Sequence, residues 1–259
     1  MSSRNKPLVS IITVCFNSQK TIRKTIESVN NQSYENIEHI FIDGKSNDDT
    51  ISIIKSTSKR IKLLISEKDD GIFDAMNKGY ELSNGLIIAF LNSDDSYTDN
   101  KVIDRIVDAF RENSIGCAYG NVLFHKNNKI TRVYKTGEYV KGRFLRSWTP
   151  PHPTFFFNKN IISEEDLPLY DKSLRLTADF ELMFKILELK NIKYKYINEF
   201  LVKMTEGGAS TKSIISSYRI TKEVKLIFKK HNKPLNIANY LFWKFTKAIL
   251  QKVIYPFYK

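Results

Sequence analysis

Two adjacent acidic residues, Asp94 and Asp95, end the apolar stretch LIIAFLNSDD in the first half of the chain. Neighbouring carboxylates at the end of a buried strand repel each other, and a cation or hydrogen-bond donors relieve that repulsion. Mg²⁺ is usually held by one or two carboxylates together with substrate phosphates. The pair therefore indicates a site for a divalent metal and a diphosphate, although isolated acidic pairs also cap helices or lie in solvated loops.

A third acidic residue, Asp43, follows the apolar stretch that ends in FIDG. An acid at the end of a strand can accept hydrogen bonds from ribose or from a base N–H, as it does in dinucleotide-binding folds. An acid before a glycine is also common in turns, so Asp43 alone leaves both readings open. The chain contains neither GxGxxG nor GxxxxGK[ST], which counts against the dinucleotide-binding and P-loop classes.

The elements that must position these acids are three short apolar stretches, at 8–17, 37–44 and 86–95. Their β-branched residues and polar ends are typical of buried parallel strands. Helical repeats lie between them, the first two with predicted caps at Ser18 and Asp48 and the third, from Ile72, predicted to end at Gly85. Strands that alternate with helices predict a doubly wound, mostly parallel α/β sheet.

Ligands of open parallel sheets bind at the carboxyl ends of the strands. The three predicted strands end at Asn17, Asp43 and residues 92–95. We therefore expect these three places to lie together and to form the site.

The second half of the chain is less regular. Strands are predicted at 116–124, 129–135, 153–157 and 194–202, and helices at 177–190, 213–230 and 236–254. We find no internal repeat and no low-complexity linker. We therefore expect one domain over residues 1–211, with a nucleotide-binding half (7–115) and an acceptor half (116–211), followed by a basic, aromatic helical extension (212–259).

The net charge of +13 suggests an anionic partner, but its distribution is uneven. Residues 212–259 hold eleven Lys or Arg and one acid, Glu223, which leaves only +3 for residues 1–211. The two cysteines, Cys15 and Cys117, lie in apolar runs and are too few for a disulfide framework, so we expect a reducing compartment. The short apolar stretch near the N-terminus reads as a strand rather than as a signal peptide.

Three strings carry a specific resemblance: PLVSIITVCFN (7–17), FIDGKSNDDT (41–50) and EKDDGIFDAMNKGYELSNGLIIAFLNSDD (67–95). They resemble the family 2 glycosyltransferases, and most closely the bacterial branch that builds O-antigen, capsule and exopolysaccharide repeat units. The likeness covers about residues 7–210. It implies a Rossmann-like GT-A fold, a nucleotide-sugar donor that is usually UDP-linked, and transfer with inversion.

The resemblance also implies roles for single residues. Asp43 matches the family's uracil-contacting acid, and residues 92–95 match its DxD element, with Asn92 where many members carry an acid. In that element Asp94 is expected to face the ribose and Asp95 to bind Mg²⁺ or Mn²⁺. The other residues expected to contact the nucleotide sugar are Thr13, Phe16, Asn17, Asp74 and Asn77.

The string TADFELMF (177–184) resembles the family's ED or AD element, in which Asp179 matches the catalytic base. An inverting displacement needs one carboxylate to take the proton from the acceptor hydroxyl. Glu181 lies two residues further on and points to another face of the helix, so it is a candidate for acceptor binding rather than the base. The alternative role for Asp179 is to stabilise the N-terminus of its own helix.

Two further segments are candidates. His152, in TPPHPTFFF, stands where the family has a polar residue near the acceptor, and a structural histidine is the alternative. Residues 207–210 (GGAS) resemble a family turn that closes over the donor, where backbone N–H groups can approach phosphate. An ordinary flexible turn is the alternative there.

The basic tail interleaves lysines with aromatic residues, a composition that fits a helix lying on an anionic membrane surface. The same helices could instead pack on the domain. Since enzymes of this type usually act on undecaprenyl-diphosphate-linked sugars, we expect a cytoplasmic protein, peripheral on the inner face of the membrane, with no nucleic-acid partner. No window is apolar enough to span a bilayer.

The expected function is therefore inverting, metal-dependent hexosyl transfer from a nucleotide sugar to a lipid-linked saccharide in surface polysaccharide synthesis. A glycoside hydrolase is an alternative, because it also uses two carboxylates. A basic nucleic-acid-binding protein is the alternative from another class, and it predicts basic residues spread along one face of the whole domain.

Overall fold

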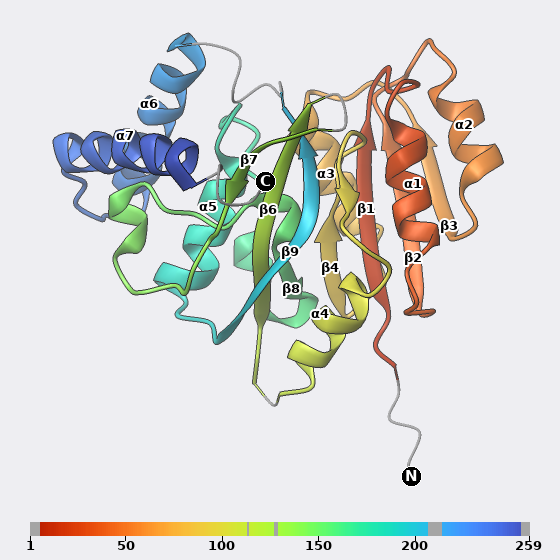
Figure 1. Ribbon diagram of the computed structural model, residues 1–259, viewed down its shortest axis with the longest axis horizontal. Helices are drawn as coiled ribbons and strands as arrows, with labels where there is room; N and C mark the ends of the chain where they lie inside the picture. Colours follow the sequence, from red (N-terminus) through yellow and green to blue (C-terminus); the bar gives the residue numbers. More distant parts are fainter. Residues whose placement is uncertain (1–5, 113, 127–128, 207–213, 255–259) are drawn as a thin grey trace.

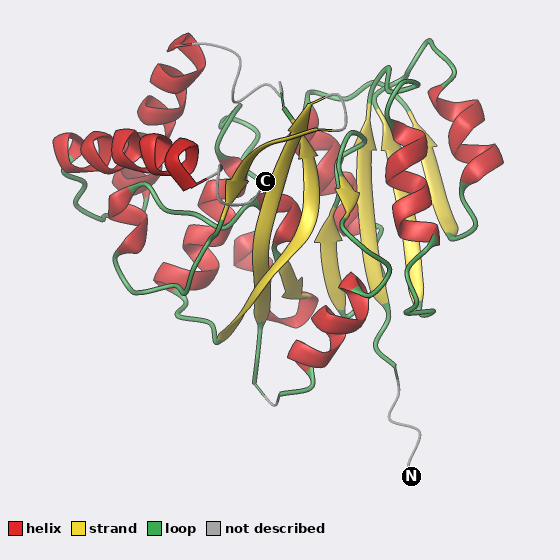
Figure 2. Ribbon diagram, viewed as in Figure 1, coloured by secondary structure: helices red, strands yellow, loops and turns green. Residues whose placement is uncertain are grey.

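The computed structural model describes residues 6–112, 114–126, 129–206 and 214–254. One mixed sheet runs through the described part, with helices on both of its faces (Figure 2). The strand order is β3-β2-β1-β4-β8-β6-β9-β5, and β7 pairs with β6 at the side of this path.

The first half of the chain alternates strands and helices as the sequence predicts. The elements are β1 (Val9–Cys15), α1 (Ile22–Asn30), β2 (Ile37–Asp43), α2 (Thr50–Thr57), β3 (Ile61–Ser66), α3 (Ile72–Glu81) and β4 (Ile87–Phe90). Strands β3, β2, β1 and β4 pair in parallel in that order. Their carboxyl ends therefore share one edge of the sheet, at the top of Figure 1.

The second half completes the sheet with shorter and antiparallel pairings. Its elements are β5 (Ser96–Tyr97), α4 (Val102–Phe110), β6 (Cys117–Lys126), β7 (Lys129–Tyr134), β8 (Phe156–Asn158), α5 (Ala178–Phe184), β9 (Tyr194–Thr205), α6 (Ile214–Lys230) and α7 (Ile237–Ile254). Strand β8 is antiparallel to both β4 and β6, and β9 is parallel to β6. As a result β6 and β9 point the same way as β1–β4, and the sheet is mostly parallel as expected.

The core lies on both faces of the sheet. Every residue of β1 and β2 is buried, which is why these strands read as continuous apolar runs rather than as alternating patterns. On one face Ile12 and Val14 of β1 pack with α3, α5 and α6 in a single cluster. On the other face Val9 and Ile11 belong to a cluster that includes α4, and Cys15 packs with α1 and α2.

Several sequence predictions of local structure need correction. Helix α1 begins at Ile22, and Ser18 contributes its backbone carbonyl to that start rather than a side-chain cap. Helix α3 ends at Glu81 rather than at Gly85. Gly85 lies against β1, where an added Cβ would come within 2.6 Å of the Ser10 backbone nitrogen. Strand β8 starts at Phe156 rather than at 153, since residues 152–154 form a 3₁₀ turn next to the prolines.

The two C-terminal helices differ in how they meet the domain. Helix α6 buries Val224, Ile227 and Phe228 in the main core cluster. Helix α7 lies across β7 and the 3₁₀ turn at 143–146 (Figure 1). It leaves Phe242 and Phe245 largely exposed. In the part of the chain that the structure describes, no helix is both long and apolar enough to cross a membrane.

Candidate active site

The carboxyl ends of β1, β2, β3 and β4 bring the predicted site segments together. Cys15 pairs with Asp43, and Asp43 pairs with Ser66, so three neighbouring strands end at the same level. The loop after β4 joins this edge through a 2.9 Å hydrogen bond between the hydroxyls of Ser93 and Ser18. Asn17, Asp43 and residues 92–95 therefore lie along one edge, as the sequence predicts.

Asp94 and Asp95 sit in the loop after β4, where the backbone is fixed from two sides. The Thr205 hydroxyl donates to the Asp94 carbonyl at 2.7 Å, and the Thr25 hydroxyl donates to the Asp95 carbonyl at 2.7 Å. Burial raises the pKa of the Asp94 carboxyl. Burial and then the Asp94 charge raise the pKa of the Asp95 carboxyl well above its usual range. The site therefore favours a positive charge beside these two acids.

The oxygen atoms at this loop fit a hard divalent cation. Asn92 donates through Nδ2 to the Asp95 carboxylate at 3.3 Å, while its Oδ1 is buried and has no hydrogen-bond partner within the described residues. Two carboxylates and one amide oxygen are ligand types that Mg²⁺ and Mn²⁺ accept. In the described ranges, no group of three or more His, Cys, Asp or Glu residues is arranged to hold a metal ion, so a metal here needs further ligands from a substrate diphosphate or water.

Asp43 is fully buried at the end of β2. Its Oδ2 accepts hydrogen bonds from the Ser46 backbone N–H at 2.8 Å and the Ser66 hydroxyl at 2.7 Å, and its Oδ1 accepts from the Ser46 hydroxyl at 2.5 Å. The carboxylate thus holds the loop after β2 in place. A base can reach Asp43 only after the Ser46 hydroxyl moves aside, which the sequence did not indicate.

The residues expected at the end of β1 separate into two groups. Thr13 does not line a pocket: it is fully buried, and its hydroxyl lies 2.9 Å from Nε2 of His39. Alternate side chains of a strand point to opposite faces, and Thr13 faces the helix layer of α1 and α2. Phe16, by contrast, is 62% exposed, and Asn17 accepts a 3.0 Å hydrogen bond from the Asn47 N–H that joins the loops after β1 and β2.

Gly44 is enclosed by two side chains of the site edge. An added Cβ would lie 2.6 Å from Oδ2 of Asp69 and 3.5 Å from the Phe16 ring. The exposed aromatic ring and a carboxylate therefore flank the backbone at Gly44. Asp69 was not selected from the sequence, although it lies in the EKDDG string that carries the resemblance.

Asp74 and Asn77 tie α3 to the loop before α5. Asp74 accepts from Lys172 at 2.9 Å and lies 3.5 Å from Lys78. Asn77 is buried and uses its side-chain amide to bind both the backbone carbonyl and the backbone N–H of Tyr170, at 2.9 and 2.8 Å. These internal contacts correct the expectation that Asn77 faces the nucleotide sugar, and they leave Asp74 at the edge of the site.

Asp179 lies half-buried in the first turn of α5. Its Oδ1 accepts a 2.8 Å hydrogen bond from the Phe180 N–H, which is the helix-end contact that an acid makes in this position. Burial is the main cause that raises the pKa of the carboxyl from 3.8 to about 6, and the Glu223 charge adds to the rise. A carboxylate with such a pKa is ionised at neutral pH and still binds a proton readily.

His152 and Tyr170 join the second half of the chain to the end of β4. Nε2 of His152 lies 2.8 Å from the Tyr170 hydroxyl, and both rings pack on Phe90, each with ring centroids 5.3 Å apart. The nearby Asp179 charge contributes to the raised pKa of Tyr170, after burial. Burial lowers the pKa of His152 to about 4, so the ring is neutral at pH 7. Since Phe90 stands two residues before Asn92, the two halves of the chain meet here.

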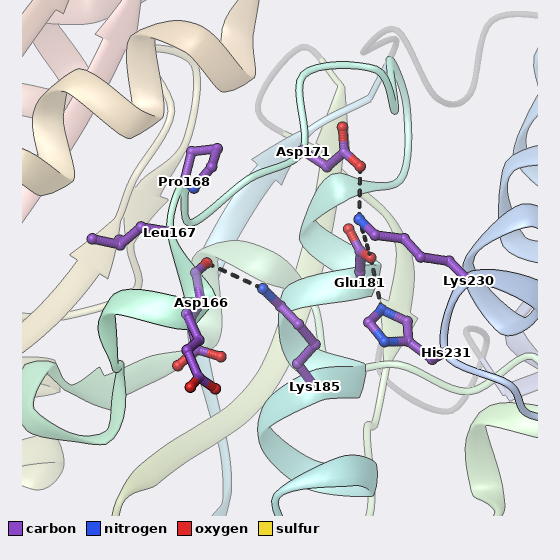
Figure 3. Close-up of a pocket in the computed structure, with 9 residues that line it drawn as sticks. Asp166, Leu167, Pro168, Asp171, Glu181, Lys185, Lys230 and His231 are labelled. Carbon is purple, nitrogen blue, oxygen red and sulfur yellow. Dashed lines mark hydrogen bonds and ion pairs between the residues drawn. The ribbon is translucent and has the colours of Figure 1, made fainter.

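Glu181, which is expected to contact the acceptor, lies against the end of α6. Its carboxylate is buried and pairs with Lys230 at 2.9 Å and with His231 at 2.7 Å, at the end of α6 (Figure 3). These residues line a cavity of about 360 Å³ between α5 and α6. The contacts show that Glu181 joins two helices, and its expected contact with the acceptor stays a prediction.

Sequence reasoning also missed Tyr170 and Arg175, which have no local motif. Arg175 donates to the Asp70 carbonyl at 2.8 Å, so it fastens the loop before α5 to the turn before α3. In the sequence, Arg175 could have been noticed only because it lies four residues before Asp179, the expected base. Residues 207–210, the expected turn over the donor, lie outside the described residues.

Comparison with known proteins gives one family and several individual likenesses. The model of the family described as "Glycosyl transferase family 2" matches residues 10–167. The chain is 30% identical over 187 residues to the Escherichia coli protein named UDP-Glc:alpha-D-GlcNAc-diphosphoundecaprenol beta-1,3-glucosyltransferase WfgD, which covers 71% of this chain and 72% of WfgD. It is 29% identical over 241 residues to the E. coli enzyme of the same activity name, WfaP, covering 90% and 92% of the two chains.

Solved structures support the fold. Staphylococcus aureus TarS 1-349 in complex with UDP-GlcNAc matches with a TM-score of 0.69 at 15% identity, over 92% of this chain and 73% of that one. A Pyrobaculum calidifontis mannosyltransferase in complex with GDP-Man and Mn²⁺ matches with a TM-score of 0.65 at 15% identity, over 95% and 74%. The chain covers 41% of the longer TarS structure. These likenesses confirm the expected GT-A fold class.

Proposed function

Because the chain belongs to glycosyl transferase family 2, we propose that it moves a sugar from a UDP-linked donor to a hydroxyl of a saccharide carried on undecaprenyl diphosphate. Family membership makes the chain a glycosyltransferase rather than a glycoside hydrolase. The proposed donor and acceptor follow the names of WfgD and WfaP. Each of these two proteins matches this chain over most of both lengths.

One observation carries the proposal: segments from both halves of the chain pack together at the end of β4. Asp94 and Asp95 lie in the loop that follows this strand, and His152 and Tyr170 of the second half pack on Phe90, its last residue. An inverting transferase needs residues on two sides of the reacting sugar. One side of the reacting sugar holds the leaving diphosphate, and the other holds the base and the acceptor hydroxyl.

In this proposal Asp179 takes the proton from the acceptor hydroxyl while that oxygen attacks the anomeric carbon of the donor. The bond from the anomeric carbon to the UDP oxygen breaks as the new glycosidic bond forms, so the configuration inverts. The pKa of about 6 suits this role, because the carboxylate is mostly ionised at pH 7 and is a stronger base than an ordinary aspartate. His152 is neutral and half-buried, and we assign it to positioning the acceptor side through Tyr170.

Asp95, with the Oδ1 of Asn92, would hold the divalent ion. Such an ion, when bound, offsets the negative charge that develops on the departing diphosphate. The carboxylates by themselves repel a diphosphate, so these residues fit the donor only together with a cation. This accounts for two adjacent acids, one half-buried and one buried, whose pKa values are both raised.

The nucleotide would lie along the edge formed by the loops after β1 and β2. Phe16 offers an exposed ring beside Gly44 on which a base can stack, and Asn17 holds the two loops together. Asp43 can accept the base N–H once the Ser46 hydroxyl rotates away. Asp94 is the acid closest in sequence to the metal ligand and is assigned to the ribose side.

The direct test is release of UDP from UDP-glucose in the presence of a GlcNAc-diphosphate-lipid acceptor, with Mn²⁺, with Mg²⁺ and with EDTA. We expect acceptor-dependent release that stops in EDTA. A thermal-shift panel of UDP-, GDP- and dTDP-sugars with Mn²⁺ identifies the donor base, since a ligand that binds only the native state raises its Tm.

Lys62→Gln provides a matched control, because Lys62 is an exposed residue of the edge strand β3 and lies outside the proposed site. It should leave the Tm shift unchanged, whereas Asp95→Asn should remove the Mn²⁺-dependent part. UDP release that is equally fast without an acceptor, or no shift with any nucleotide sugar, would contradict the proposed function.

A further inference from the structure

A large cavity lies apart from the acids, between α7 and the segment that follows β7. It has a volume of about 720 Å³. Its walls come from β7, from the 3₁₀ turn Arg143–Arg146 and from α7, which crosses both. We call this cavity the α7 groove. None of the site residues discussed above lines it.

The α7 groove is basic. Its lining includes Lys135, Lys141, Arg143, Arg146 and Lys247, and it includes no acidic residue. Within the described residues, Lys141, Arg143, Arg146 and Lys247 form no ion pair with a carboxylate. A 3₁₀ turn places side chains three residues apart on the same side, which directs both arginines of the turn to one wall. Such a wall fits an anion with several oxygen atoms.

The same groove is also apolar and aromatic. Both tryptophans of the chain, Trp148 and Trp243, line it. Arg143 lies 5.1 Å from the centre of the Trp148 ring and Arg146 lies 5.4 Å from that of Trp243, so cations and rings alternate along the wall. Val140 and Leu250 line it too, and they are 65% and 50% exposed.

Beyond the groove, α7 presents further apolar side chains to solvent. Phe242, Phe245 and Ile249 are each more than 60% exposed. Exposed apolar patches of this kind mark surfaces that meet other molecules or a membrane. A ligand that combines a diphosphate with a hydrocarbon chain could therefore place its charge against the arginines and its chain along this side of α7.

The groove is connected to the acceptor side of the candidate site. Phe144 of the 3₁₀ turn packs on Phe180, with ring centroids 5.3 Å apart, and Phe180 directly follows Asp179. From Trp148 the chain continues through Thr149 to His152, and the Thr149 carbonyl accepts a 3.0 Å hydrogen bond from Tyr134 of β7. One wall of the groove thus runs on into the segment that carries His152.

We propose that the α7 groove binds the diphosphate and the first isoprene units of the lipid-linked acceptor, and so presents the acceptor sugar to Asp179. This assignment rests on the proposed function for its choice of ligand. The charge complementarity and the adjoining apolar surface support a prenyl diphosphate over a free phosphate, which needs no apolar wall. A general anionic membrane surface and a nucleic acid are the alternative ligands that the test distinguishes.

The test uses intrinsic tryptophan fluorescence of the full chain, because both tryptophans line the groove and report on it alone. The probe is farnesyl diphosphate, titrated in the presence of saturating UDP and Mn²⁺ so that the donor site is occupied. Farnesol and inorganic pyrophosphate, titrated separately, represent the two halves of the probe. We expect farnesyl diphosphate to change the fluorescence saturably and to bind at least about tenfold more tightly than either half.

Arg146→Gln tests the charged wall. Losing a charge-assisted hydrogen bond should weaken farnesyl diphosphate binding by about tenfold to a hundredfold. Arg219→Gln is the matched control: Arg219 is an exposed arginine of α6 outside the groove, and its replacement removes the same charge without effect on binding. Lys141→Gln is a second test, since Lys141 is exposed and its replacement leaves the ring contacts intact.

Each other outcome overturns the assignment. If pyrophosphate and farnesyl diphosphate bind with equal affinity, the groove does not bind the isoprene chain. If Arg219→Gln weakens farnesyl diphosphate binding as much as Arg146→Gln does, the loss reflects net charge rather than a contact in the groove. Binding of phosphatidylglycerol vesicles or RNA that farnesyl diphosphate does not displace would point to the alternative ligands. The Tm shift with UDP-glucose and Mn²⁺ measures the donor site separately. If only the groove assignment is wrong, this shift persists while farnesyl diphosphate does not bind; if the transferase proposal is wrong, the shift itself is absent.

Discussion

Replacing Asp179 by asparagine should separate catalysis from stability, because the carboxylate is unfavourable for the fold and necessary for the proposed reaction. Asparagine keeps the shape of the side chain, and its Oδ1 can still accept the hydrogen bond from the Phe180 N–H. What the substitution removes is the charge and the ability to take a proton. We expect a folded, more stable and inactive protein.

The size of the stability change follows from the pKa of the carboxyl, which burial raises from 3.8 to about 6. One pKa unit corresponds to about 1.4 kcal/mol, so ionised Asp179 lowers the free energy of unfolding at pH 7 by up to about 3 kcal/mol. The native carboxyl binds its proton at higher pH than the unfolded one. The cost is therefore fully present above pH 6 and disappears as the pH falls towards 4.

Urea denaturation of the wild-type protein and of Asp179→Asn, at pH values between 4 and 7, measures this difference. We expect the variant to be more stable at pH 7 by up to about 3 kcal/mol and the two proteins to converge near pH 4. In the transfer assay, kcat should fall by about 10²- to 10⁴-fold in the variant. Wild-type kcat/KM should fall about tenfold per pH unit below pH 6, as the base becomes protonated.

Two results would refute this reasoning. Near-normal transfer by a folded Asp179→Asn protein would show that another group is the base. A variant that is less stable by about 0.3–1 kcal/mol, with activity retained, would mean that Asp179 acts only on the N-terminus of its helix. An inactive variant without any gain in stability would instead contradict the inferred burial of the charge.

The other predictions concern the metal site, the α5–α6 junction and the sheet. Asp95→Asn should abolish the Mn²⁺-dependent Tm shift with UDP-glucose, and an unchanged shift would show that Asp95 is not a metal ligand. The variant should also raise the Tm of the free protein, because it removes a buried carboxylate with a raised pKa. Glu181→Gln should lower the free energy of unfolding by about 1 kcal/mol, because it weakens the hydrogen bonds to Lys230 and His231 while Lys230 keeps Asp171, and the nucleotide-sugar shift should persist. Gly85→Ala should destabilise by about 1–3 kcal/mol in urea denaturation, because its Cβ would meet the Ser10 backbone, and wild-type stability would contradict this close approach.

Local sequence patterns were sufficient for the strands that carry the site. β1, β2 and β4 are buried on both faces, so each reads as a continuous apolar run that closes on a polar residue. β3 was missed because IKLLIS is half-exposed at the edge of the sheet and carries a lysine. α4 was also missed, although its apolar residues repeat at helical spacing and the signal was present.

The sequence by itself thus determined which strand ends lie together, because the parallel strands place Asn17, Asp43 and Asp94–Asp95 at one edge of the sheet. It could not determine what each side chain contacts there. Thr13 bonds His39, Asn77 binds the Tyr170 backbone, and Glu181 pairs with α6; all three partners lie at least 26 residues away in the chain.

Only the tertiary structure decided how the second half of the chain completes the site. The pKa of Asp179 depends on burial by distant segments, and the packing of the second half on the end of β4 depends on His152 and Tyr170. The sequence left open whether the C-terminal helices pack on the domain or lie on a membrane surface. In the structure, α6 joins the core, while α7 crosses β7 and borders a basic, aromatic groove. Such features arise from contacts between segments far apart in the chain, which spacing along the sequence does not encode.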